Sequence, residues 1–174
     1  REEGADKMEG LMIPVGFSDF AEIREKNYYY VDKTGLIETL LQAGTTKVTL
    51  ITRPRRFGKT LGMSMLESFF DIRRESKSLF DGLEIAQNQV LCEKWMNQCP
   101  TVFVSFRKVD GLNFTSAYGM LVMVITELFN KHLYVLENEN GTEFERTAFK
   151  HIASRQASEE EIKNSLALLT SMIQ

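Results

Sequence analysis

The feature that most constrains the fold of this chain is a short apolar run, Val48–Thr52, that leads through a basic loop into an amphipathic segment. Nearly every residue of the run is β-branched or apolar, which is typical of a strand buried on both faces. A helix is predicted from Lys59 to about Ile72, because apolar residues recur there at spacings of 4, 4 and 3. A second strand-like run, Thr101–Phe106, follows Pro100. Strands that alternate with helices predict an α/β fold with a parallel sheet.

The loop between the first run and its helix ends in Gly58-Lys59-Thr60. These residues match the end of the phosphate-binding pattern G-x-x-x-x-G-K-[ST]. In that pattern glycine lets the backbone approach phosphate, lysine reaches the β- and γ-phosphates, and the hydroxyl binds magnesium. Arginine replaces the first glycine of the pattern. Four cations lie within seven residues of a chain whose net charge is −3: Arg53, Arg55, Arg56 and Lys59.

This cluster of positive charge predicts a bound anion, and the loop has three interpretations. The loop is a solvated basic turn, or it binds nucleic-acid phosphate, or it binds a nucleoside triphosphate, which the strand–loop–helix context favours. A nucleoside triphosphate with Mg²⁺ is therefore the predicted ligand, with Thr60 as the magnesium ligand. Which of the three arginines faces the phosphates is left open. The predicted nucleotide-binding residues of the loop are Arg53, Pro54, Arg55, Arg56, Phe57, Gly58, Lys59, Thr60 and Leu61.

Several segments together resemble the predicted AAA-ATPase-like family of bacteria. They are Ile13–Phe20, Tyr28–Thr34, Arg53–Thr60, Met65–Phe70, Leu79–Ile85 and Val102–Phe106. In that family the loop commonly reads RPRRFGK[ST], so the resemblance implies that Arg53 is the family's own variant. It also implies ATP binding, with Lys59 and Thr60 in the places of the Walker A lysine and hydroxyl. Longer members carry a C-terminal nuclease-like domain of the PD-(D/E)XK type, which is the implied partner of this segment.

Two residues before the first run are further candidates. The resemblance hints that Tyr30 stacks on the base and that Asp32 forms a hydrogen bond nearby. The simpler interpretation, favoured from the residues, is that the tyrosine packs in the core and that Asp32 caps a helix from about Lys33 to Ala43.

Hydrolysis needs an acidic residue after a second hydrophobic strand, but Thr101–Phe106 runs into Arg107 and Lys108. The resemblance implies a P-loop ATPase in the full-length protein, with the acidic strand following beyond Gln174. The expected fold is thus a P-loop NTPase-type three-layer parallel sheet with flanking helices, of which residues 11–174 form the N-terminal part. Residues 1–10 are expected to be a flexible leader. A small nucleotide or metabolite kinase, or a non-enzymatic nucleic-acid-binding module that uses the arginine-rich loop, is the alternative function.

The remaining elements are predicted to be helical, over 87–97, 114–133 and two C-terminal segments. Capping boxes mark the starts of the last two, Thr142 with Glu145 and Ser158 with Glu161. A content of 43% hydrophobic residues excludes intrinsic disorder. No signal peptide or membrane-length apolar stretch is present, so a cytoplasmic protein is expected, with homo-oligomerisation left open. The apolar stripe predicted for the last helix is Ile162, Leu166, Leu169 and Ile173.

Overall fold

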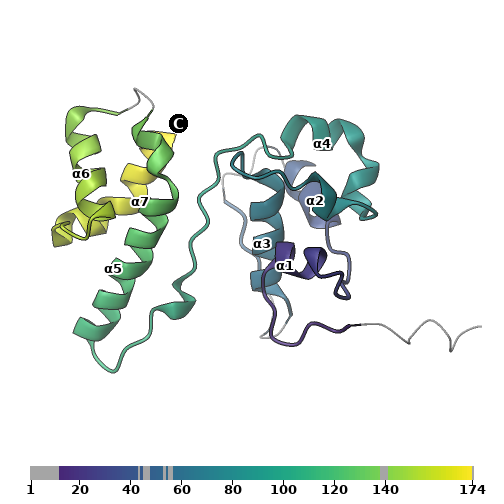
Figure 1. Cartoon of the computed structure of the whole chain (residues 1–174), viewed down its shortest axis with the longest axis horizontal. Coiled ribbons are helices and arrows are strands. Elements are labelled where there is room, and N and C mark those ends of the chain that lie inside the picture. The colour runs from purple at the N-terminus through teal and green to yellow at the C-terminus, as the bar shows by residue number, and fades with distance from the viewer. Residues whose placement is uncertain are drawn as a thin grey trace, which may run out of the picture. The chain divides into compact units, whose positions relative to one another are not determined.

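The computed structural model describes residues 12–42, 44, 48–52, 54, 57–137 and 141–173. Within this part of the chain there are seven α-helices and four short 3-10 turns (Figure 1). The chain divides into two compact units, Arg1–Thr101 and Val102–Gln174. The helices of the first unit are α1 (Phe20–Glu25), α2 (Gly35–Gln42), α3 (Lys59–Phe70) and α4 (Gln89–Trp95). Those of the second are α5 (Phe114–Lys131), α6 (Glu143–Ala153) and α7 (Glu159–Ile173).

The expected α/β fold with a three-layer parallel sheet is wrong. Among the described residues the β-type pairing is confined to one isolated parallel bridge between Asp71 and Cys99. The predicted strand Val48–Thr52 has no regular secondary structure, and its side chains at Val48 and Leu50 are 82% and 84% exposed. A β-branched run forms a strand only where a second strand satisfies its backbone groups, and the described part of the first unit supplies none.

The second predicted strand, Thr101–Phe106, fails for a different reason. Two of its residues, Val102 and Val104, are half-buried against the core of the second unit. That core is built from helices, so these two valines are covered by helical side chains and not by a neighbouring sheet. The segment ends in the 3-10 turn η3 (Phe106–Lys108), which the Ser105 side chain caps by accepting from the Arg107 N–H.

The first unit packs α1, α2, α3 and two 3-10 turns, η1 (Lys77–Phe80) and η2 (Glu84–Gln87), around one apolar cluster. Helix α1, which the sequence patterns did not predict, begins at an Asp19 cap whose carboxylate accepts from the Glu22 N–H. It is tied to α3 because the Phe20 N–H donates to the buried Ser64 hydroxyl over 3.0 Å. The fully enclosed members of this cluster are Phe20, Ile37, Met65, Phe69 and Phe80.

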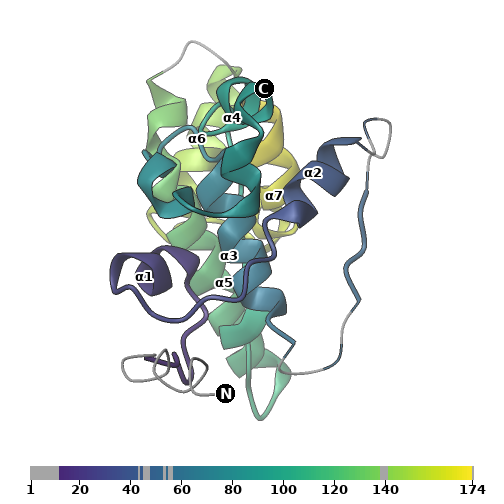
Figure 2. The same ribbon diagram turned by 90° about the vertical axis from the view of Figure 1, so that its right-hand side faces the viewer.

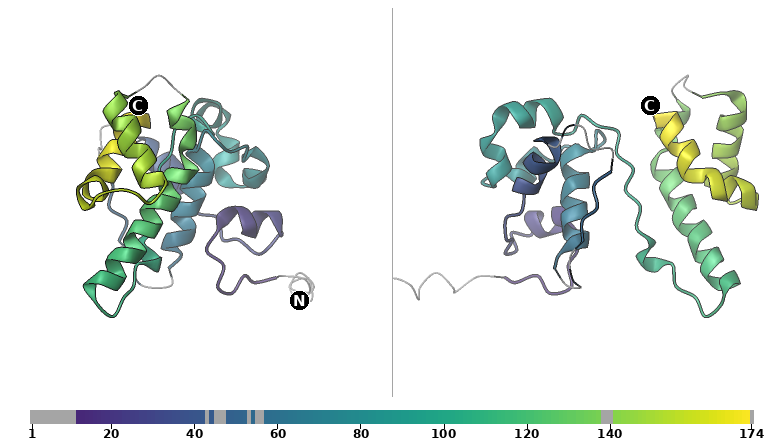
Figure 3. Two further views of the ribbon diagram at one scale, coloured as in Figure 1. Left: turned by 60° about the vertical axis from the view of Figure 1, so that its left-hand side comes forward. Right: turned by 180° about the vertical axis from the view of Figure 1, so that it is seen from behind.

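The second unit is a three-helix assembly in which α5, α6 and α7 pack against one another (Figure 3). Both predicted capping boxes are confirmed. Thr142 and Glu145 exchange hydrogen bonds at the start of α6, and Ser158 and Glu161 do the same before α7.

The buried face of α7 differs from the predicted stripe. Ile162 and Leu169 are buried as expected, but Leu166 is 37% exposed. Ser165 and Met172 face the core in its place. The helical spacing of the buried residues was therefore predicted correctly. The buried face itself is rotated slightly around the helix axis, because it packs against α5 and α6.

The other predicted helices are confirmed with shorter ends, as α2, α3, α4 and α5. Helices fray at their ends, so differences of a few residues are expected. Across the described residues, no helix has both the length and the apolar character that a bilayer-spanning segment requires.

Candidate functional site

The candidate site is the start of α3, where Gly58 is the N-cap residue. Its backbone is left-handed, with φ of 74° and ψ of 22°, a conformation that glycine adopts without the penalty a Cβ imposes. The Gly62 N–H donates to the Gly58 carbonyl over 2.8 Å, which is the first hydrogen bond of the helix. The sequence pattern placed glycine here for close approach to phosphate, and the structure adds a second reason, the positive φ.

The N-cap residue of α3, Gly58, has no side chain with which to cap the first turn, and that turn contains no acidic residue. The first N–H groups of any helix have no partner within the helix. The helix dipole adds a partial positive charge at this end. The first turn of α3 is therefore an electrostatically positive end, to which an anion is the complementary ligand.

The Lys59 side chain folds back across the loop, where its ammonium donates to the Pro54 carbonyl over 3.1 Å. Thr60 is exposed on the same turn. Leu61 is half-buried against the core of the first unit. What Leu61 can offer a ligand is therefore its backbone N–H and not its side chain.

A pocket of about 380 Å³ lies at this end of α3. Figure 2 shows Val48–Thr52 as a segment without helix or strand, separate from α2 and α3. Two lysines, Lys33 and Lys59, line the pocket. Its described lining residues are Lys33, Leu36, Ile51, Phe57, Gly58, Lys59, Gly62 and Met63.

Lys33 is the site residue that motif reasoning missed. It lies ahead of α2, 24 residues before Phe57, whose carbonyl accepts from the Lys33 ammonium over 3.5 Å. No spacing rule for phosphate loops includes such a residue. The signal available in the sequence is its place in the Tyr28–Thr34 segment, directly after Asp32.

The three arginines predicted to bind phosphate, Arg53, Arg55 and Arg56, lie outside the described residues. Their assignment to the site stays a prediction.

Tyr30 and Asp32 are not among the described residues that line the pocket. The Tyr30 ring packs edge-on against Phe20 with 5.2 Å between ring centroids. Burial raises the pKa of Tyr30 to about 12. This packing agrees with the interpretation of Tyr30 as a core residue.

The Asp32 carboxylate accepts hydrogen bonds from the N–H and hydroxyl of Thr34, over 2.8 Å and 2.7 Å. It also accepts from the Glu84 N–H over 2.7 Å. Partial burial acts to raise the pKa of Asp32, but these hydrogen bonds outweigh it and lower the pKa below its usual value. Helix α2 begins at Gly35, so Asp32 holds the preceding turn and is not the N-cap predicted for a helix from Lys33.

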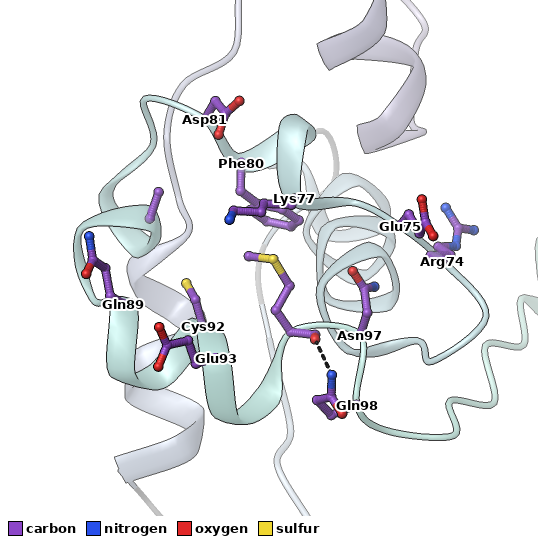
Figure 4. A pocket seen from close by; sticks show the side chains of 12 residues that line it. Arg74, Glu75, Lys77, Phe80, Asp81, Gln89, Cys92, Glu93, Asn97 and Gln98 are labelled. Carbon is purple, nitrogen blue, oxygen red and sulfur yellow. Dashed lines mark hydrogen bonds between the residues drawn. The ribbon is translucent and has the colours of Figure 1, made fainter.

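A larger cavity of about 830 Å³ lies elsewhere in the first unit, beside α4 (Figure 4). Cys92, Gln89 and Glu93 lie on one side, and Arg74 and Glu75 lie on the other. Burial raises the pKa of the Cys92 thiol, and its Sγ donates to the Ile85 carbonyl over 3.2 Å. The lining carries charges of both signs, so this cavity does not select a ligand of one charge.

Comparison with known proteins defines the class to which the fold and loop belong. Residues 14–173 match the family described as "Predicted AAA-ATPase". Because the match spans most of the chain, the chain belongs to this AAA-ATPase-like family.

One curated relative is similar over a shorter stretch. A protein of Azotobacter chroococcum mcd 1, named "Uncharacterized protein in vnfD 5'region", is 38% identical over 95 residues. That stretch is 54% of this chain and 17% of the relative, so the chain matches less than a fifth of the relative's length. No solved structure matches the chain.

Proposed function

We propose that this chain binds a nucleoside triphosphate, ATP in the first instance, with its phosphates at the N-terminal end of α3. The observation that carries the proposal is one pocket that combines the left-handed Gly58, the start of α3 without an acidic residue in its first turn, and two lysines. Each of these features favours an anion, and a triphosphate supplies several negative oxygens to satisfy them. Membership of the AAA-ATPase-like family supports the choice of nucleotide.

Each residue has a distinct part in this proposal. The N–H groups of Lys59, Thr60 and Leu61 donate to phosphate oxygens, as helix N-termini do. The Lys59 ammonium, now on the Pro54 carbonyl, lies where it can move to the β- and γ-phosphates. The loop arginines add charge around the same anion.

Magnesium fits this site only together with the nucleotide. Mg²⁺ prefers six oxygen ligands and retains several waters, with substrate phosphates completing the shell. The Thr60 hydroxyl, exposed on the first turn, is the protein ligand proposed for it. Bound there, the ion would offset negative charge on the β- and γ-phosphates.

The described pocket residues are cationic, apolar or glycine. Such residues suit the binding and positioning of a nucleotide, and we therefore propose nucleotide binding.

Titration calorimetry with ATP and Mg²⁺ tests the proposal on the wild-type chain, Lys59→Ala and Lys77→Ala. Lys77 is a matched control, because it is an exposed lysine of the first unit that lines the other cavity. Loss of a charge-assisted contact worth about 1.5–3 kcal/mol weakens binding by roughly 10- to 150-fold. We expect this loss for Lys59→Ala and wild-type affinity for Lys77→Ala. Equal affinities for Lys59→Ala and wild type, or no binding by wild type, would contradict the proposal.

A further inference from the structure

Lys33 approaches the phosphate loop from a separate element. Its ammonium donates to the Phe57 carbonyl over 3.5 Å, which is long for a hydrogen bond of this kind. A Cβ placed on Gly58 would lie 3.5 Å from the same nitrogen. The ammonium therefore borders the part of the Gly58 backbone that a phosphate would approach. An ammonium carries three donors, so the weak contact with Phe57 leaves it capacity for anionic oxygens.

The turn that carries Lys33 is anchored on both sides of it. The preceding Asp32 carboxylate binds the N–H groups of Thr34 and Glu84. The following Thr34 is fully buried, and its hydroxyl accepts from the Ile85 N–H over 3.1 Å. Both anchors reach η2, so the backbone of Lys33 is held although its side chain is exposed. A held backbone reduces the conformational entropy that the lysine loses when it contacts a ligand.

The charges around this lysine also call for an anion. Lys33 and Lys59 line one pocket, and the positive end of α3 lies there without an acidic residue in its first turn. Like charges in one pocket repel each other, and the helix dipole adds to the repulsion. A polyphosphate removes this repulsion more completely than a monophosphate, because its negative charge extends over more than one phosphoryl group.

We propose that Lys33 is a second phosphate-binding lysine of this pocket, and that it makes the site select nucleoside triphosphates over monophosphates. The inference rests on the proposed function, since it assigns a role within the same phosphate site. Asp32 then acts as a positioning residue, because it holds the turn from which Lys33 extends.

Calorimetry with ATP, ADP and AMP, each with Mg²⁺, tests the inference on wild type, Lys33→Ala, Lys33→Arg and Lys59→Ala, with Lys77→Ala as the matched control. We expect Lys33→Ala to weaken ATP binding about tenfold and AMP binding less than about twofold, with ADP between them. Lys33→Arg keeps the positive charge and should restore most of the ATP affinity. The fluorescence of Trp95, which packs against the core of the first unit, shows whether each variant is folded.

The possible results separate this inference from the proposed function. If Lys59→Ala loses ATP binding while Lys33→Ala binds all three nucleotides like wild type, the role of Lys33 is refuted and the proposed function stands. An equal loss for ATP, ADP and AMP in a folded Lys33→Ala would also refute it, because a purely structural role predicts no dependence on phosphate number. Absence of ATP binding by wild type would refute both.

Discussion

The ion pair between Asp71 and Arg73 closes the first unit, and its removal is the perturbation with the best-defined outcome. The Arg73 guanidinium binds the carboxylate twice, with Nε to Oδ1 at 2.9 Å and Nη2 to Oδ2 at 2.6 Å. Nη2 also donates to the Thr101 carbonyl over 3.2 Å, at the last residue of the unit. The pair therefore links the end of α3 to the segment that leaves the unit.

The expected loss of stability depends on how deeply the two side chains of this ion pair are buried. The Asp71 side chain is 2% exposed and the Arg73 side chain is 25% exposed. Removing one partner of a buried ion pair costs about 3–5 kcal/mol where the other charge is left without compensation. Here Arg74 Nε stays 4.0 Å from Asp71 Oδ2, which favours the lower end of that range. Since Arg73 retains some contact with solvent, we expect Arg73→Ala to lower the free energy of unfolding by about 3 kcal/mol. Arg73→Lys keeps the charge without the two-point geometry and should lose about half of that.

Urea unfolding followed by tryptophan fluorescence measures this loss in the first unit. Trp95 is the single tryptophan of the chain, and it packs against the core of that unit. Lys77→Ala again serves as the matched control, because it removes an exposed cation from the same unit. A midpoint for Arg73→Ala equal to that of Lys77→Ala would refute the argument that the buried pair stabilises the unit.

The same pair predicts a pH dependence. Burial acts to raise the pKa of Asp71, but the hydrogen bonds and charge of Arg73 outweigh it and lower the pKa below the usual 3.8. A carboxyl whose pKa is lower in the folded state stabilises the fold above its unfolded pKa and loses that effect as the pH falls through the folded value. The free energy of unfolding of wild type should therefore exceed that of Arg73→Ala by the largest amount at neutral pH, and this difference should shrink below about pH 4. A difference that stays constant into this acid range would contradict the assignment.

Two further predictions concern one residue in each unit. Gly58→Ala should lower the free energy of unfolding of the first unit by about 1–2 kcal/mol, because alanine is strained at a φ of 74°. The control is Gly62→Ala, because Gly62 is at a helical position with open space for a Cβ. If Gly58→Ala and Gly62→Ala were equally stable in urea unfolding, backbone strain at position 58 would be excluded. Phe129→Ala should destabilise the second unit by about 3–5 kcal/mol, since Phe129 is fully buried and its ring centroid lies 4.7 Å from that of Phe149. This loss should lower the midpoint of thermal unfolding measured by circular dichroism. The control Phe144→Ala should change that midpoint little, because Phe144 is exposed.

The part of the site that sequence reasoning recovered is local in the chain. Gly58, Lys59 and Thr60 were expected at the start of a helix, and α3 begins at Lys59. Their relation depends on backbone geometry over a few residues, which is why a pattern of residue types captures it. The part it missed, Lys33, depends on how the turn before α2 is held against η2, an interaction over more than fifty positions.

Most of the helices, the two C-terminal capping boxes and the basic loop can be predicted from the sequence, because helix periodicity and caps act between residues three or four apart. The other features depend on tertiary packing. Val48–Thr52 remains without a partner strand among the described residues, and Val102 and Val104 are half-buried against helices. The α7 face turns to Ser165 and Met172, and Lys33 comes to lie beside Gly58. Each of these depends on which distant groups satisfy a backbone or cover an apolar face, and a pattern of neighbouring residues carries no information about that choice.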